Sequence, residues 1–335
     1  MTVGLTSEDL LRDIRSEFLS TYNRNVKADS KLGLVMRLGI PSTKRTERFG
    51  YFESTPTLEH WARGDDMPED DLLAQSYSVS NLSWGKAISF HEDDAEDVQL
   101  GSIREQSRRL GARASKLPQD VHFQILTAAS SSTLLPSIPN APDGAALFAA
   151  TAGGAARFGV SGGNIITGDG VATGAAIRAD FWEAMARFRL FQDTEGEELM
   201  TGDEIDAGVV IEYNAANAEV FHEAFKQDRT VNIVQNVAGT ENVGGAAVTN
   251  SAKESGISVT LWPTQKISDN DWTITLKSPM VPRPMFQMVR AAPRVIEENR
   301  TNSTRARRSK KHAVLIDARF GFGINLPYGS IKVNN

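Results

Sequence analysis

The sequence predicts an α+β protein in which long extended segments surround a smaller mixed α/β body. Apolar residues alternate with polar ones along both arms of a hairpin-like segment. They recur every three or four residues over 100–128 and alternate again over 314–326. Period two is typical of a strand with one buried face, and the three-four spacing is typical of an amphipathic helix. The predicted order is arm, hairpin, long helix, mixed body and returning strand.

Composition limits the class of protein. The chain of 335 residues has room for two or three modest domains, or for one elongated body with extensions. Its net charge of -6 argues against a surface built wholly to bind nucleic acid. There is no cysteine, which excludes disulfides, thiolate metal sites and cysteine nucleophiles. We therefore expect stability to come from packing and from partners.

The first residues, Met1 to Leu5, lack the basic start and apolar run of a signal peptide. No apolar run reaches the roughly 18 residues that a membrane span needs. We expect the protein in the cytoplasm, or in a particle assembled there, with no membrane partner.

Residues 1–47 are predicted to form an arm that begins with a helix over 6–22. The apolar stripe of this helix consists of Leu11, Ile14 and Phe18. Residues 24–47 are polar and basic, with glycines and a proline, and are predicted to be extended. The stripe must dock on an apolar surface, which lies either in the same chain or on a neighbouring subunit.

Residues 48–95 are predicted to form a long hairpin. Phe49 and Tyr51 alternate on the first arm. The second arm alternates at Leu82, Trp84, Ile88 and Phe90. The alternation changes phase near Asn81, which predicts a β-bulge. Because a lone hairpin is marginal in water, we expect another molecule to cover it, which favours a self-assembling structural protein over a compact enzyme.

The remaining chain is predicted to be a long helix, a mixed body and a final strand. The helix over 98–129 is interrupted or kinked at Pro118. Loops and short strands follow over 130–178, and residues 238–256 are predicted to be a glycine-rich loop. Further helices are predicted at 179–191 and 214–226, and strands at 208–212, 230–237, 257–262 and 271–277.

No catalytic, cofactor or metal site emerges from the motifs. The glycine-rich loop 168–174 has GxGxxxG spacing rather than GxGxxG and lacks the lysine of a phosphate-binding loop, so nucleotide binding is the weaker interpretation. The acidic run 91–97 lacks the glycine turn of a calcium loop and better fits the start of a helix, while 65–71 is predicted to be a solvated loop. The five histidines are scattered outside any nucleophile or zinc motif.

A basic run occupies residues 300–312. Its six fixed positive charges are Arg300, Arg305, Arg307, Arg308, Lys310 and Lys311. Such a run can bind phosphates without reading sequence, because it has no aromatic residue to stack on bases. A solvated loop between two strands, or docking on an acidic patch of a neighbouring copy, explains it equally well.

Short motifs gather between Phe49 and Ala129: Gly50-Tyr51, Pro56-Thr57-Leu58-Glu59-His60-Trp61, Tyr77-Ser78-Val79, Ile88-Ser89 and the acidic Glu92–Asp97. Weaker ones follow at Asp143-Gly144 with Leu147-Phe148, at Trp272, and at Asp317-Ala318-Arg319 with Pro327. Together they resemble the Mu-type major head subunit family, the capsid proteins of Mu-like tailed phages.

The resemblance implies the Hong Kong 97-type capsid fold, with an N-terminal arm, an extended loop, a spine helix, a peripheral domain and an axial domain. It implies an arm at 1–47, an extended loop at 48–95, and the spine helix with the first part of the peripheral domain at 96–179. The axial domain is expected at 180–293, and the peripheral domain is expected to resume with the returning strand at 294–335.

The implied function is non-enzymatic. Hexamers and pentamers would tile an icosahedral head around double-stranded DNA, with portal, scaffold or protease, and decoration proteins as further partners. The predicted subunit-interface residues are Leu10, Leu11, Ile14 and Phe18 in the arm and Tyr51, Trp61, Trp84 and Phe90 in the hairpin, with packing inside the chain as the alternative for each. A tail tube or decoration protein, or a nucleotide-dependent enzyme, are the other functions considered.

Overall fold

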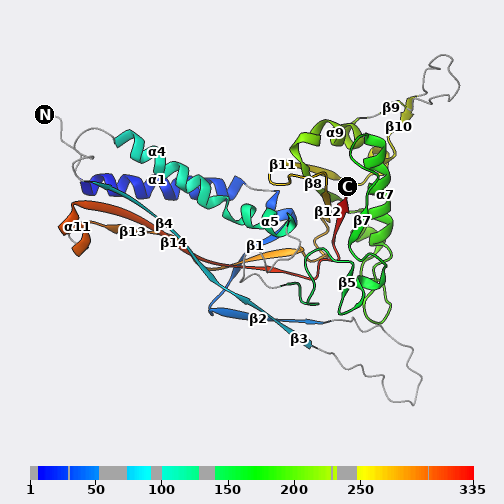
Figure 1. The fold of residues 1–335 in the computed structure, drawn as a ribbon, viewed down its shortest axis with the longest axis horizontal. Coiled ribbons are helices and arrows are strands. Elements are labelled where there is room, and N and C mark those ends of the chain that lie inside the picture. The colour runs from blue at the N-terminus through cyan, green and yellow to red at the C-terminus, as the bar shows by residue number, and fades with distance from the viewer. Residues whose placement is uncertain are drawn as a thin grey trace. The chain divides into compact units, whose positions relative to one another are not determined.

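The computed structural model describes residues 7–28, 31–52, 74–91, 100–127, 140–227, 229–231, 247–300 and 302–335. The chain divides into two compact units, each built from segments that are distant in sequence (Figure 1). The first unit contains Met1–Glu47, Ser78–Gln124 and Phe286–Gly323, and the second contains Arg48–Tyr77, Ile125–Met285 and Ile324–Asn335.

The first unit is built on a four-stranded sheet with the order β1-β13-β14-β4. Its strands are β1 (Met36–Pro41), β13 (Met285–Glu298), β14 (Lys311–Ile324) and β4 (Leu82–His91). β4 runs antiparallel to β14, from Lys311 opposite His91 to Phe320 opposite Leu82. The alternation predicted for the final strand is confirmed, because the even-numbered residues from Val314 to Ile324 are all buried.

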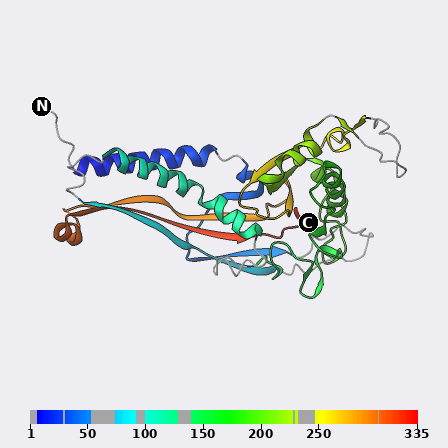
Figure 2. The same ribbon diagram turned by 45° about the horizontal axis from the view of Figure 1, so that its top comes forward.

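Two helices of the first unit pack closely against each other, as both views show (Figures 1 and 2). They are α1 (Ser7–Ala28) and α4 (Leu100–Ser115). Small residues of α4 permit the approach: Ser107 Oγ donates to the Ile14 carbonyl oxygen at 2.8 Å. A Cβ at Gly111 would lie only 2.8 Å from the Phe18 carbonyl oxygen. The predicted helix is confirmed over the described residues 100–127, and the break near Pro118 separates α4 from α5 (Leu117–Thr127).

Two expectations for the first part of the chain are corrected. Residues 24–47 are not a uniformly extended arm, because α1 continues to Ala28 and is followed by α2 (Leu32–Val35) and β1. The predicted hairpin is divided between two sheets. β2 (Thr46–Phe52) pairs with β3 (Ala74–Ser80), whereas β4 pairs with β14. The phase change at Asn81 is therefore the break between β3 and β4 rather than a bulge inside one arm.

The second unit contains a five-stranded mixed sheet with the order β11-β8-β12-β15-β7. Its strands are β11 (Val259–Thr264), β8 (Val209–Asn214), β12 (Trp272–Leu276), β15 (Ser330–Asn334) and β7 (Ile165–Thr167). β11 and β8 are parallel, as are β15 and β7, whereas β12 is antiparallel to both of its neighbours. The strands predicted at 208–212, 257–262 and 271–277 are confirmed within a few residues.

Aromatic side chains form the core of the second unit between this sheet and two helices, α7 (Gly174–Phe188) and α9 (Ala218–Lys226). The Phe221 ring stacks on Tyr213 at a centroid distance of 3.9 Å and meets Trp272 edge-on at 5.4 Å. Both helices match the predicted segments. One face of the sheet thus supplies β8, β12 and β15 residues to a continuous core.

The shorter elements are β5 (Thr151–Ala152), β6 (Ala155–Ala156), η1 (Arg157–Gly159), α8 (Gly202–Asp206), η2 (Ala215–Asn217), β9 (Arg229–Val231), β10 (Ala247–Thr249), α10 (Ser251–Glu254) and α11 (Thr304–Ser309). β10 and α10 lie in the segment expected to be a loop, whose first part is outside the described residues. β13 begins at Met285, and β15 belongs to the sheet of the second unit.

Candidate functional site

The predicted interface residues of the arm whose side chains are described are buried within the first unit. Leu11, Ile14 and Phe18 are each 0% exposed, and Leu11 and Ile14 pack with Phe90 and Val314. Their burial is explained by packing within the first unit, which favours the intrachain alternative for these residues and for Phe90. The side chains of Leu10 and Tyr51 and the whole of Trp61 lie outside the described residues. A contact of any of these residues with another subunit stays a prediction.

Trp84 differs from the other predicted interface residues whose side chains are described, because it borders an apolar cavity of about 310 Å³. The half-buried indole meets Phe322 edge-on at 6.1 Å. Its Nε1–H has no hydrogen-bond acceptor among the described residues. The cavity lies between helices α4 and α5 and the sheet, and its lining includes Leu110, Leu117, Ile316 and Phe320. The apolar cavity beside Trp84 is therefore the candidate surface for a partner.

The basic run forms the turn between β13 and β14, as the solvated-loop interpretation predicted, with one added helical turn. Ser303 Oγ caps α11 by accepting from Ala306 N at 3.4 Å, and Lys310 ends the helix in the left-handed conformation with φ of 52°. The structure exposes all six predicted cationic side chains: Arg300, Arg305, Arg307, Arg308, Lys310 and Lys311. The turn therefore concentrates positive charge at one place on the first unit.

The glycine-rich loop at 168–174 donates its amides to acceptors of the same chain. Gly168 N donates to the Asn334 carbonyl oxygen at 2.8 Å, Asp169 N to Asp180 Oδ1 at 2.9 Å, and Gly170 N to Asn335 Oδ1 at 3.0 Å. Thr173 Oγ1 then caps α7. These contacts occupy three amides of the loop, so the geometry favours a helix start over a nucleotide cradle.

Burial raises the pKa of the Asp180 carboxyl, and the neighbouring Asp169 and Glu183 carboxylates add to this effect. The hydrogen bond from Asp169 N opposes it in part. Asp180 Oδ2 has no hydrogen-bond partner among the described residues. Asp180 is thus a buried acid that holds the loop by accepting from Asp169 N, and its charged form is disfavoured.

Arg157 is a residue that the sequence reasoning missed. Its side chain is 1% exposed. Nε and Nη2 donate hydrogen bonds to the two carboxylate oxygens of Asp143, at 2.7 and 3.1 Å. Nη1 donates to the carbonyl oxygens of Ala146 and Leu147 at 2.8 and 2.9 Å. Burial lowers the pKa of Arg157, and Asp143 counteracts the change. The Asp143 and Leu147 motifs are therefore parts of one buried network whose centre is an arginine in an Ala/Gly-rich segment.

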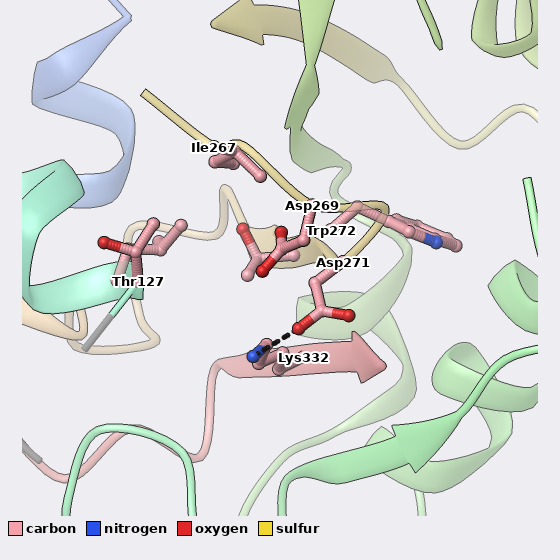
Figure 3. Close-up of a pocket in the computed structure, with 8 residues that line it drawn as sticks. Thr127, Ile267, Asp269, Asp271, Trp272 and Lys332 are labelled. Carbon is pink, nitrogen blue, oxygen red and sulfur yellow. Dashed lines mark ion pairs between the residues drawn. The ribbon is translucent and has the colours of Figure 1, made fainter. Parts of the chain in front are cut away.

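A small cavity in the second unit is lined by Thr127, Ile267, Asp269, Asp271, Trp272 and Lys332, among others (Figure 3). Lys332 Nζ points toward Asp271 Oδ2, at 2.6 Å. The cavity volume of about 10 Å³ has room for about one water molecule. A substrate would not fit.

Neither a metal cluster nor a membrane helix stands out in the described ranges. No group of three or more His, Cys, Asp or Glu side chains there is placed to hold a metal ion. Among the helices in the same ranges, none combines the length and the apolar character that crossing a bilayer requires. Most of the acidic run 91–97 and all of 65–71 lie outside them.

Comparison with known proteins finds a family that matches less than half of the chain. Residues 10–136 match the family described as Mu-like prophage major head subunit gpT. The major capsid protein of Escherichia phage Mu is 25% identical over 87 residues, which are 26% of this chain and 28% of that protein. The match thus spans little more than a quarter of that relative's length.

Solved capsid structures share the fold of nearly the whole chain at low identity. The capsid of an empty GTA particle has a TM-score of 0.55 at 9% identity, covering 91% of this chain and 90% of that one. The mature capsid of bacteriophage PhiM1 has a TM-score of 0.53 at 9% identity, covering 91% and 87%. A virus-like particle from Pyrococcus furiosus has a TM-score of 0.50 at 11% identity, covering 96% and 98%. The chain has the Hong Kong 97-type capsid fold, and through residues 10–136 it is related to the Mu-like prophage major head subunit family.

Proposed function

We propose that this chain is the major capsid protein of a tailed phage head. Many copies, arranged as hexamers and pentamers, would close an icosahedral shell around double-stranded DNA. The supporting observation is that head-subunit similarity over residues 10–136 coincides with a capsid fold covering 91% of the chain. The role would be structural rather than catalytic. The protein would be a component of the virion after assembly in the host cytoplasm.

The proposed mechanism is geometric. β2 and β3 form a two-stranded ribbon, and such a ribbon is marginal in water unless another surface covers it. In a shell, a neighbouring copy would supply that surface, with Tyr51 and Trp61 as proposed ribbon contacts. Trp84 would contribute through the apolar cavity beside it. Because each copy makes several such contacts, modest pairwise energies would sum to a stable particle.

The basic turn between β13 and β14 is the proposed site of contact with the packaged DNA. Its exposed arginines and lysines favour phosphate binding through release of counterions, without sequence preference. Docking on acidic residues of a neighbouring copy is the second candidate for this turn. Portal, scaffold or protease, and decoration proteins are proposed as further partners of the assembled shell.

The test is to express the full chain and image the purified material by electron microscopy. Closed shells of uniform size are the expected result. Rods would support a tail tube protein instead, and a monomer that stays dispersed at high concentration would contradict self-assembly. Equilibrium binding of ATP or NAD to the subunit would support the nucleotide-dependent enzyme.

A further inference from the structure

We propose that a polar latch, formed by Ser42, Glu47 and Asn81, fixes the angle between the end of β3 (Ser78–Ser80) and β4, both of which lie in the first unit. The latch is a positioning device. It deepens the proposed function and rests on it, because the strand that carries the ribbon must start from a fixed position for the ribbon to reach a neighbouring copy. All three residues belong to the first unit, so the latch is described by contacts within that unit alone.

Glu47 closes the turn between β1 and β2. Its Oε1 accepts three hydrogen bonds, from Ser42 Oγ at 3.0 Å and from the amides of Thr43 and Lys44 at 2.8 Å each. Hydrogen bonds to a charged acceptor are stronger than those between neutral groups. The same donors lower the pKa of Glu47, those of Lys44 and Thr43 most. The carboxylate therefore holds the turn in one conformation.

Asn81 ties this turn to the break between β3 and β4. Its Nδ2 donates to Ser42 Oγ at 2.6 Å and to the Lys44 carbonyl oxygen at 2.8 Å, and its backbone N donates to the Arg45 carbonyl oxygen at 2.8 Å. Thr46 follows Arg45 and Ser80 precedes Asn81. Their Oγ1 and Oγ atoms are 3.0 Å apart and add a further contact between the two segments. Both segments that connect the ribbon to the sheet are thus joined at the same point.

The latch is seated on the central strands of the sheet. Ser42 N donates to the Val289 carbonyl oxygen of β13 at 3.2 Å. On β14, a Cβ at Gly321 would lie 2.6 Å from Met288 Cε and 3.0 Å from Asn81 Oδ1. A side chain at position 321 would therefore crowd Asn81 and Met288, and both would have to shift to admit it.

Asn81 does more than satisfy the hydrogen bonds of one turn, because it stands at the break between two strands. β3 and β4 are separated by this single residue, and an uninterrupted strand would be the simplest path for the chain. The side chain of Asn81 bridges to residues 37 and 39 positions earlier, and these bonds are available only when the chain bends here. Removing them should allow the end of β3 and β4 to approach a single strand, with a changed distance between Ser78 and Ser89 in the first unit.

The absence of cysteine allows the angle between β3 and β4 to be measured. Spin labels would be attached to the full chain at Ser78→Cys on β3 and Ser89→Cys on β4, both of which are exposed positions of the first unit. Pulsed electron resonance then reports the distance distribution between them. We expect one narrow distribution for the parent. Asn81→Asp cannot donate to Ser42 or Lys44. Each hydrogen bond that is removed should lower the ratio of molecules at the parent distance to molecules at other distances roughly fivefold.

Two further variants separate the latch from general damage. Gly321→Ala leaves every latch donor and acceptor in place but crowds Asn81, so the distribution should shift with the hydrogen-bonding groups intact. Glu195→Ala removes an exposed carboxylate from a turn of the second unit and should leave the distribution unchanged. Circular dichroism confirms that each variant is folded. If Asn81→Asp does not fold, Ser42→Ala is measured in its place. This variant removes the hydroxyl that bonds to both Glu47 and Asn81 and does not change the charge.

An unchanged distribution in Asn81→Asp, or in Ser42→Ala if that variant decides, overturns the latch. The measurement is made on subunits, so it does not depend on shells being formed. Shells in normal yield with unchanged distances would reject the latch and leave the proposed function standing. A parent chain with one narrow distribution that shifts in the variants, but which never forms shells, would reject the function alone.

Discussion

The two units differ in how completely each fills its own interior. In the second unit, aromatic rings stack at distances as short as 3.9 Å, and the cavity at Lys332 has room for about one water molecule. In the first unit, a helical layer lies against a sheet and an apolar cavity of about 310 Å³ remains beside Trp84. Its β13–β14 turn also exposes a cluster of cations. The second unit is packed as a self-sufficient core, whereas the first retains apolar space and charge that partners can use.

The two tryptophans Trp272 and Trp84 provide the largest test of this contrast. Trp272 is 0% exposed in the second unit, and Trp84 is half-buried at the cavity of the first. Trp272→Ala should lower the free energy of unfolding by about 3–5 kcal/mol, because it leaves a large void in a close-packed core. Trp84→Ala should cost less than half as much, since its ring already borders empty space. Urea unfolding of each variant measures both, and equal losses would contradict the contrast.

The sequence predicted which segments are strands better than it predicted their partners. Alternation at Leu82, Trp84 and Phe90 correctly indicated a strand, but the partner is β14, more than 200 residues away, rather than β2. Pairing depends on long-range packing that a local period does not contain. β13 was missed because Pro293 falls inside it, and a proline argues against a strand when no neighbours are known.

The same limit applies to the candidate sites. The stripe of Leu11, Ile14 and Phe18 correctly predicted a helix with one apolar face, but the surface that receives it is set by tertiary structure. The exposed basic turn was predictable because like charges in a run rarely bury. Arg157 had no such signal. Its partners lie 7 to 14 residues away in a segment without periodicity, so only the fold brings them together.

The first unit is not loosely packed throughout, because α1 and α4 lie in close contact. Gly111→Ala would place a methyl group 2.8 Å from the backbone oxygen of Phe18, so the helices must separate. We expect a loss of about 1–3 kcal/mol, the usual cost of overpacking. Gly33→Ala is the matched control in the same unit, because a Cβ there meets nothing within 4 Å. Thermal unfolding that is equally affected by both would show that close packing at Gly111 is not the cause.

The basic turn tests whether the exposed charge of the first unit has a polyanionic partner. Replacing Arg305, Arg307 and Arg308 with alanine should weaken retention of DNA by purified particles. The slope of log affinity against log salt should fall by about 0.9 for each phosphate that the variant no longer neutralises. Alanine at the exposed Arg24, Arg290 and Arg319 changes the net charge of the same unit equally and serves as the control. The same slope in both triple variants would favour docking on an acidic neighbour, or no specific role for the turn.

The smallest effect is expected at Asp180, a buried carboxyl group of the second unit. Burial raises the pKa of Asp180 above that of the unfolded chain. Its contribution to stability is therefore fully present below the unfolded pKa and is lost as pH rises through the folded pKa. Asp180→Asn keeps an oxygen to accept from Asp169 N but has no charge to bury. Relative to the parent, this variant should gain stability on going from acidic to neutral pH, by less than the loss expected for Gly111→Ala. Asp203→Asn, an exposed carboxylate in the same unit, serves as the control. If the difference in stability between Asp180→Asn and the parent stays constant across this pH range, the buried acid carries no penalty. That result would mean that the second unit tolerates charge as readily as the first.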